Sequence, residues 1–145
     1  MICLIQRVTH AQVVVDSQLI GKIQTGLVVL TAFQPNDSTE KIEKMVHKLL
    51  HYRCFSDHDG KMNLNIQQAE GALLLVPQFT LAATTHKGLR PSFSSSAAPE
   101  MARGLFDIFV DLCKQPSTPV ETGRFGADMQ VTLTNDGPVT FWLEG

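Results

Sequence analysis

Most apolar residues of this chain lie in short continuous or alternating runs typical of β-strands, and only two segments carry them at helical spacing. The N-terminal third predicts strands over residues 1–8, 11–15, 19–23 and 27–33, which are rich in Val, Ile and Leu and separated by turn residues. Because residues 27–30 are apolar without interruption, we expect the last of these strands to be central in a sheet.

Two helices are predicted between the strands. The first begins after Asp37, which with Glu40 forms a capping-box-like pair, and its apolar residues recur at helical spacing to about residue 52. The second begins at Pro99, a residue suited to the first helical position, and its apolar face ends at Cys113.

The remaining segments return to strand patterns. Residues 72–76 predict a buried strand, and residues 129–134 and 139–143 alternate around Asn135-Asp136-Gly137-Pro138, which predicts a terminal hairpin. The order strands, helix, strands, helix, strands predicts an α+β fold. We expect a mainly antiparallel, curved, barrel-like sheet with two helices packed on it, in a single domain over residues 1–145.

Charge and composition exclude several classes of protein. The formal net charge of −2 argues against a broad surface that coats nucleic acid. The three cysteines are odd in number and far apart, which favours reduced thiols and a cytoplasmic protein. No apolar run approaches the roughly 20 residues of a membrane span, so no membrane association is expected.

Most standard catalytic and metal-binding motifs are missing, and we predict neither a metal nor a cofactor. His47 and His51 have metal-ligand spacing on the first helix, but they fall opposite its apolar stripe, which favours a solvated face. The serines of residues 92–96 include candidate nucleophiles with no local base in view.

Two short segments carry more chemistry than their surroundings. Gln78-Phe79-Thr80 follows a deeply apolar strand, and Gly137-Pro138-Val139-Thr140 places a proline beside an alternating strand. From pattern alone, a strand end and a hairpin turn are the simpler interpretations.

The two segments together resemble the D-aminoacyl-tRNA deacylase (D-Tyr-tRNA deacylase) family. The resemblance rests on V-P-Q-F-T-L at residues 76–81 and N-D-G-P-V-T-F-W at residues 135–142. Supporting matches are I-Q-R-V-T at 5–9, K-M-N-L-N at 61–65, R-P-S-F at 90–93 and G-R-F-G-A-D-M-Q-V at 123–131. Pro77 departs from the serine usual in the family and is similar to an animal branch with P-Q-A-T-L, whereas Phe79 matches the ordinary branch.

The resemblance implies hydrolysis of the ester that joins a D-amino acid, or glycine, to the 3′ end of tRNA, as chiral proofreading of translation. It also implies a homodimer with the pocket at the subunit interface, where a cis Gly137-Pro138 peptide faces Gln78, Phe79 and Thr80 of the other subunit. Thr80, Gln78 and Phe79 are the expected catalytic residues. The expected substrate-binding residues are Gly137, Pro138, Val139, Thr140, Pro77, Leu81, Arg7 and Arg90.

A wall of main-chain atoms in the pocket would explain selectivity for D-aminoacyl and glycyl esters over L-aminoacyl esters. It excludes an L side chain on steric grounds but cannot exclude glycine, and an X-Pro bond adopts the cis form at a cost of about 0.5–1 kcal/mol. Backbone N–H groups around residues 79–81 are candidate donors to the developing oxyanion. The family relies on the 2′-hydroxyl of the terminal ribose, so Thr80 is expected to position substrate rather than to attack it. Arg7, Lys87 and Arg90 are candidate phosphate contacts.

Three alternatives stay open. A binding module would capture D-amino acids or tRNA ends without turnover. A serine hydrolase would use the loop at residues 92–96, and a metal-dependent hydrolase would use His47 and His51.

Overall fold

One long strand, β1 (Ile2–Val15), lies at the centre of the main sheet. In the computed structural model, which describes residues 1–86 and 88–145, β1 pairs antiparallel with β2 (Gln18–Ile23) and β3 (Gly26–Ala32) along one edge. Along its other edge it pairs with β8 (Gln130–Glu144). The two separate runs predicted at residues 1–8 and 11–15 therefore form one continuous strand.

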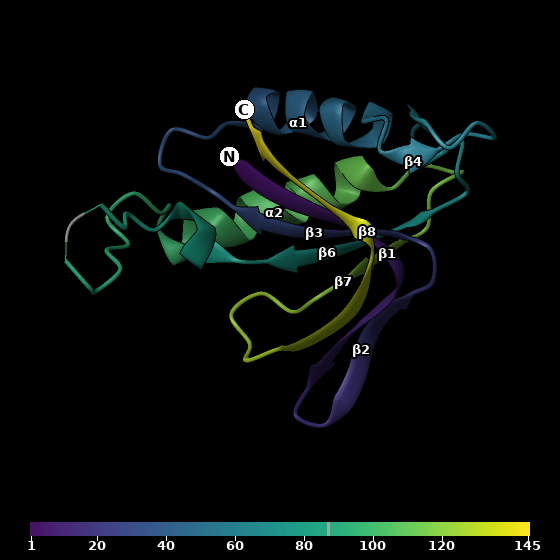
Figure 1. The fold of residues 1–145 in the computed structure, drawn as a ribbon. Coiled ribbons are helices and arrows are strands. Elements are labelled where there is room, and N and C mark those ends of the chain that lie inside the picture. Colours follow the sequence, from purple (N-terminus) through teal and green to yellow (C-terminus); the bar gives the residue numbers. More distant parts are fainter. Residues whose placement is uncertain (87) are drawn as a thin grey trace.

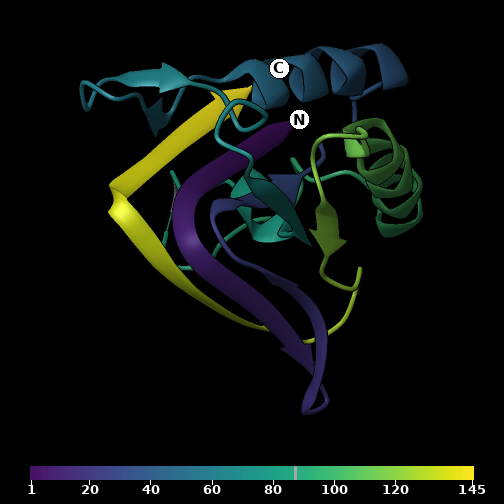
Figure 2. The ribbon, with the colours of Figure 1, turned by 90° about the vertical axis from the view of Figure 1, so that its right-hand side faces the viewer.

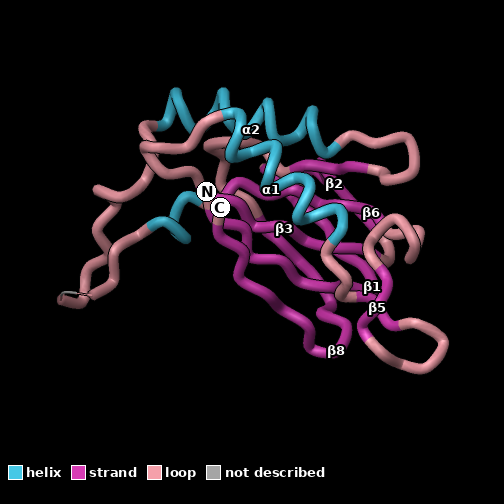
Figure 3. Tube along the Cα trace, turned by 90° about the horizontal axis from the view of Figure 1, so that it is seen from above, coloured by secondary structure: helices cyan, strands magenta, loops and turns pink. Residues whose placement is uncertain are grey.

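The predicted α+β architecture is confirmed, with one refinement. Helices α1 (Thr39–His51) and α2 (Pro99–Cys113) lie on one face of the sheet (Figure 1, Figure 3). The sheet is mixed, because β3, β6 (Ala72–Pro77) and β7 (Val120–Thr122) run parallel to one another. A helix lies in the connection from β3 to β6 and another in the connection from β6 to β7, because parallel neighbours require a crossover that carries the chain back across the sheet. A small hairpin, β4 (Phe55–Ser56) and β5 (Met62–Leu64), precedes β6.

The sheet is covered by apolar side chains on both faces. Under the helices, Phe109 is fully buried and packs edge-on against Phe33 at 6.5 Å between ring centroids. On the other face, the second half of β1 curls together with β2 and the first half of β8 around a separate apolar cluster that includes Val28 and Leu74 (Figure 2). The curl gives the sheet its barrel-like shape.

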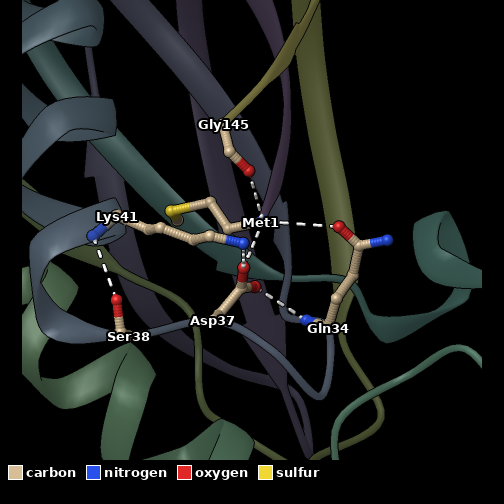
Figure 4. A network of polar contacts seen from close by, with 6 residues as sticks. All are labelled: Met1, Gln34, Asp37, Ser38, Lys41 and Gly145. Carbon is tan, nitrogen blue, oxygen red and sulfur yellow. Dashed lines mark hydrogen bonds and ion pairs between the residues drawn. The ribbon is translucent and has the colours of Figure 1, made fainter.

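The start of α1 differs from the sequence prediction. Ser38, not Asp37, caps the helix, and its side chain accepts a hydrogen bond from the Lys41 amide. The Asp37 carboxylate is buried and accepts a 2.6 Å hydrogen bond from the Met1 ammonium group, which also donates to the Gly145 carbonyl (Figure 4). The Asp37 carboxylate, which the local pattern predicts as the helix cap, therefore binds Met1 instead.

The predicted terminal hairpin is wrong. Both halves of β8 pair with β1 in the same antiparallel direction, with Asn135 opposite Val8 and Thr140 opposite Gln6. The four residues between them bulge out opposite the single residue Arg7, at the sharp bend in β8 visible in Figure 2. Because β1 is long enough to pair with both halves, the turn-forming residues produce a bulge instead of a chain reversal.

Candidate functional site

A cavity of about 470 Å³ opens at the carboxyl end of β6. Residues 76–79 form one wall, the segment that enters α2 forms a second, and residues 125–131 form the third. Among the residues expected at the site, Pro77, Gln78 and Phe79 line it, and Phe79 is 58% exposed. The volume of the cavity and its mainly apolar walls with a few polar groups are typical of small-molecule sites.

The chain turns sharply where β6 meets this cavity. After Pro77, the Gln78 amide donates to the Thr31 carbonyl at 2.7 Å, and a short 3₁₀ helix, η1 (Phe79–Ala82), begins. The Leu81 amide is used within this turn, since it donates to the Gln78 carbonyl at 3.1 Å. The amides of Phe79 and Thr80 precede the first intrahelical bond and have no acceptor within the helix. Of the predicted oxyanion donors at residues 79–81, these two amides are therefore the ones that the hydrogen bonds of η1 do not use.

Thr80 is exposed, and its hydroxyl oxygen accepts a hydrogen bond from the Gln78 side-chain amide. An amide does not remove a proton from a hydroxyl, so this contact orients Thr80 without activating it. Leu81, the next expected site residue, is half-buried and packs beside Ile2 and Ala32 rather than into the cavity.

The serine-rich segment supports η1. Ser95 donates to the Ala82 carbonyl, and Ser96 donates to the Phe79 carbonyl at 3.5 Å. Phe93, from the same segment, contacts the exposed Phe79 ring at 5.0 Å between centroids. Within residues 1–86 and 88–145, the side-chain hydrogen bonds of Ser92, Ser94 and Ser95 go to hydroxyl or carbonyl oxygens, so no base activates a serine here.

The bulge in β8 is closed by the side chain of Asn135. Its Oδ1 accepts from the Val139 amide at 2.7 Å, and its Nδ2 donates to the Thr140 hydroxyl at 3.0 Å. Gly137 has φ of +144°, and a Cβ there would lie 2.6 Å from the Val139 side chain, so only glycine fits. The Gly137–Pro138 peptide bond is cis, and Pro138 and Thr140 are exposed while Val139 is buried.

Arg7 holds the bulge from β1. Its side chain is only 11% exposed, and it donates from Nη1 to the Cys54 carbonyl at 2.7 Å and from Nε to the Asp136 carbonyl at 3.0 Å. These contacts turn the guanidinium into the protein, where it positions the bulge. Of the other predicted phosphate contacts, Arg90 is exposed, and Lys87 lies outside the described residues.

One chain does not bring the two halves of the expected site together. Pro77 lies in register with Thr31 and, through it, with Cys3, whereas the bulge lies opposite Arg7 and three strands away from β6. With about 3.3 Å per residue along a strand and about 4.8 Å between strands, Gly137 and Pro77 are roughly 20 Å apart. Gly137, Pro138, Val139 and Thr140 accordingly take no part in lining the cavity of their own chain.

The sequence analysis missed the third wall of the cavity. Phe125 and Met129 line it, and the Arg103 guanidinium lies 4.9 Å from the centre of the Phe125 ring. The signal for this wall was present in G-R-F-G-A-D-M-Q-V at residues 123–131, which served only as a supporting match.

The two histidines of α1 form a surface pair. The rings of His47 and His51 are stacked at 4.3 Å between centroids, and His51 Nδ1 lies 2.8 Å from the His47 carbonyl oxygen. In the part of the chain that the structure describes, no three His, Cys, Asp or Glu residues gather as metal ligands would. In the same part, no helix has the length and apolar character to cross a membrane.

Fold and cavity together define a small α+β protein with a cavity at the end of an inner strand of its sheet. The family model described as D-Tyr-tRNA(Tyr) deacylase matches residues 4–144, and the chain belongs to this family. It is 65% identical to the D-aminoacyl-tRNA deacylase of Hydrogenovibrio crunogenus and 56% identical to that of Salmonella typhimurium, over 99% of both chains in each case. The solved structure of the c-Myc DNA Unwinding Element Binding Protein superposes with a TM-score of 0.94 at 36% identity, covering 100% of this chain and 99% of that one.

Proposed function

We propose that this protein hydrolyses the ester between a D-amino acid and the 3′ end of tRNA, releasing the amino acid and free tRNA while sparing L-aminoacyl-tRNA. Family membership and the names of the close relatives support the reaction class. The observation that carries the proposal is the cavity, which has Gln78 and Phe79 in one wall and two backbone N–H groups without intrahelical acceptors beside it. The cytoplasm, where tRNA is charged, is the expected place of action.

The chemistry needs little from the side chains. An aminoacyl ester is already activated, and attack by water creates a tetrahedral oxyanion that backbone donors can stabilise by several kcal/mol. The amides of Phe79 and Thr80 are the candidate donors, because η1 fixes the backbone that carries them. We infer that the 2′-hydroxyl of the terminal ribose assists the attacking water, and that Gln78 and Thr80 position the ester.

The third wall suits the terminal adenosine. Phe125 and Met129 offer an aromatic ring and a polarizable thioether, both of which make favourable contacts with a flat base. With the base there, the ribose and its ester lie toward Phe79 and Gln78 at the other end of the cavity.

A second copy of the chain completes the site in this proposal. On the sheet face away from the helices, Trp142, Leu4 and Leu30 are cross-strand neighbours, and the same row continues to Val76 in the cavity wall. Trp142 is 49% exposed, and beside this row Phe79 is exposed as well. A partly exposed apolar row of this kind, beside an exposed aromatic ring, is suited to burial against an identical surface. It leads directly into the cavity, so the homodimer interface and the active site would be continuous.

Selectivity follows from the bulge of that second copy. The partner subunit's Gly137 and the partner subunit's Pro138 would face Gln78 and Phe79 and form a wall of main-chain atoms. Such a wall clashes with an L side chain. It leaves room for a D side chain on the opposite side and for glycine, so glycyl-tRNA is also expected to be a substrate.

The decisive experiment is a deacylation assay on matched D-tyrosyl-, L-tyrosyl- and glycyl-tRNA, with and without a chelator. We expect rapid loss of the D-tyrosyl and glycyl esters, survival of the L-tyrosyl ester, and no effect of the chelator. Equal hydrolysis of the D and L esters would contradict the backbone wall. Stoichiometric binding without ester loss would identify a binding module instead, and inhibition by the chelator would favour a metal-dependent reaction.

A further inference from the structure

Phe125 separates the cavity from a second groove of about 420 Å³ that runs along α2. The groove shares the Phe125 ring with the cavity and has Phe106 and Val110 of α2 in its apolar floor. The rings of Phe106 and Phe125 lie 6.1 Å apart between centroids. The Phe125 ring therefore forms the ridge between the cavity and the groove.

Positive charge lies at this ridge. Arg103 lies over the Phe125 ring, and Arg124 is its neighbour in sequence; both are exposed and both line the groove. Within residues 1–86 and 88–145, neither arginine forms an ion pair, whereas Lys114 at the groove pairs with Asp111 at 2.8 Å. Asp107 is the other carboxylate of the groove, so its charged side chains leave an excess of one positive charge.

We propose that this groove binds the nucleotide that precedes the terminal adenosine, and that Arg103 and Arg124 contact the phosphate between the two nucleotides. The inference rests on the proposed function, in which the cavity holds the terminal adenosine. The linking phosphate is bonded to the 5′ oxygen of the terminal ribose, on the same face of the sugar as the base. With the base against Phe125, this phosphate lies at the edge of the cavity near that ring. Arg103 and Arg124 are cations at an edge that the cavity shares with the groove.

The arginines suit a phosphate better than a lysine would. A planar guanidinium offers parallel N–H donors that bind two phosphate oxygens at once. Contact with the Phe125 ring restrains the Arg103 side chain in advance, so less rotamer freedom is lost on binding. Phe125 is partly exposed, so its ring also provides a surface against which an unpaired base can stack.

The experiment compares two substrates with the same ester: D-tyrosyl-tRNA and 3′-O-D-tyrosyl-adenosine, which has no phosphate. For R103A and R124A we expect kcat/KM on D-tyrosyl-tRNA to fall roughly tenfold each, the loss of one charge-assisted hydrogen bond. The adenosine ester should be hydrolysed at the wild-type rate. The slope of log kcat/KM against log salt should become shallower by about one for each arginine, and R103K should restore part of the loss.

Lys44 provides the control, because it is an exposed cation on the other helix, where it pairs with Glu40. K44A should behave as wild type on both substrates. Equal losses on both substrates would show that the arginines only support the cavity, and no loss on D-tyrosyl-tRNA would show that they do not contact it; either result overturns the inference. Failure of the wild-type protein to hydrolyse the adenosine ester and the tRNA ester alike would instead overturn the proposed function.

Discussion

At the scale of single residues, the bulge in β8 explains why its sequence is so specific. The Asn135 side chain bonds across the bulge to Val139 and Thr140, Gly137 has no space for a Cβ, and Val139 is buried in the core. Arg7 holds the Asp136 carbonyl from the other side. Each residue type is thus required by a contact within one chain, before any substrate is considered.

Replacement of Thr80 by alanine tests whether this hydroxyl reacts or only positions. Its hydrogen-bond partner is the Gln78 amide, which cannot act as a base, so we expect T80A to keep kcat within roughly tenfold of wild type, the loss of one hydrogen bond. Single-turnover hydrolysis of D-tyrosyl-tRNA measures it. Complete loss of turnover with unchanged substrate binding would identify Thr80 as the nucleophile.

The three cysteines are expected to be inert in the folded protein. Burial raises the pKa of Cys3 to about 12 and raises the pKa values of Cys54 and Cys113 as well, so all three stay protonated at pH 8. A thiol-specific chromogenic reagent at pH 8 should label no cysteine in native protein and all three after unfolding in guanidinium. Rapid labelling of the native protein would contradict this.

At the scale of elements, β1 determines how the neighbouring segments pair. Its length lets β8 pair along both halves, and Met1, the residue just before β1, donates a hydrogen bond to Asp37 just before α1 (Figure 4). Local patterns predicted a hairpin and an Asp37 cap because those are what the segments favour alone. The actual outcomes depend on β1 and on the residue just before it, which are distant in the sequence from both segments.

The buried ion pair at the start of α1 can be tested against its neighbouring cap. D37A leaves the Met1 ammonium buried without its counter-charge, which costs about 3–5 kcal/mol of the free energy of unfolding. S38A removes only the exposed cap, at about 1 kcal/mol. Urea unfolding of both variants measures the difference. Equal losses would mean that the ion pair adds nothing beyond capping.

At the scale of the whole molecule, the cavity and the bulge lie at separate places on one chain. If each site uses the partner's bulge, two different inactive variants should complement each other. G137A would disrupt the bulge, and Q78W would fill the cavity. In a mixed dimer one site carries both changes and the other carries neither, so activity should return on mixing.

The measurement is D-tyrosyl-tRNA hydrolysis after the two variants are co-refolded, with each variant refolded alone as the control. Circular dichroism of each variant establishes that it folds. Folded variants that form mixed dimers without regaining activity would place the bulge and the cavity of one site in the same subunit.

Much of this could be predicted from the sequence, for a local reason. Helix spacing and alternating strands predicted both helices, the core strands and the fold class, because periodicity reports which face of an element is buried. The motifs at residues 76–81 and 135–142 predicted the family correctly, because each motif lies within one short segment and can be recognised without the fold.

Tertiary structure alone decided the rest. Four features all join residues far apart in the chain: the parallel pairing of β6, the bulge in place of a hairpin, the use of Asp37 by Met1, and the placement of Phe125 and Met129 beside the end of β6. Such contacts depend on which distant partner is within reach when the sheet closes. A local pattern reports what a segment prefers; the packed molecule determines which partner satisfies that preference.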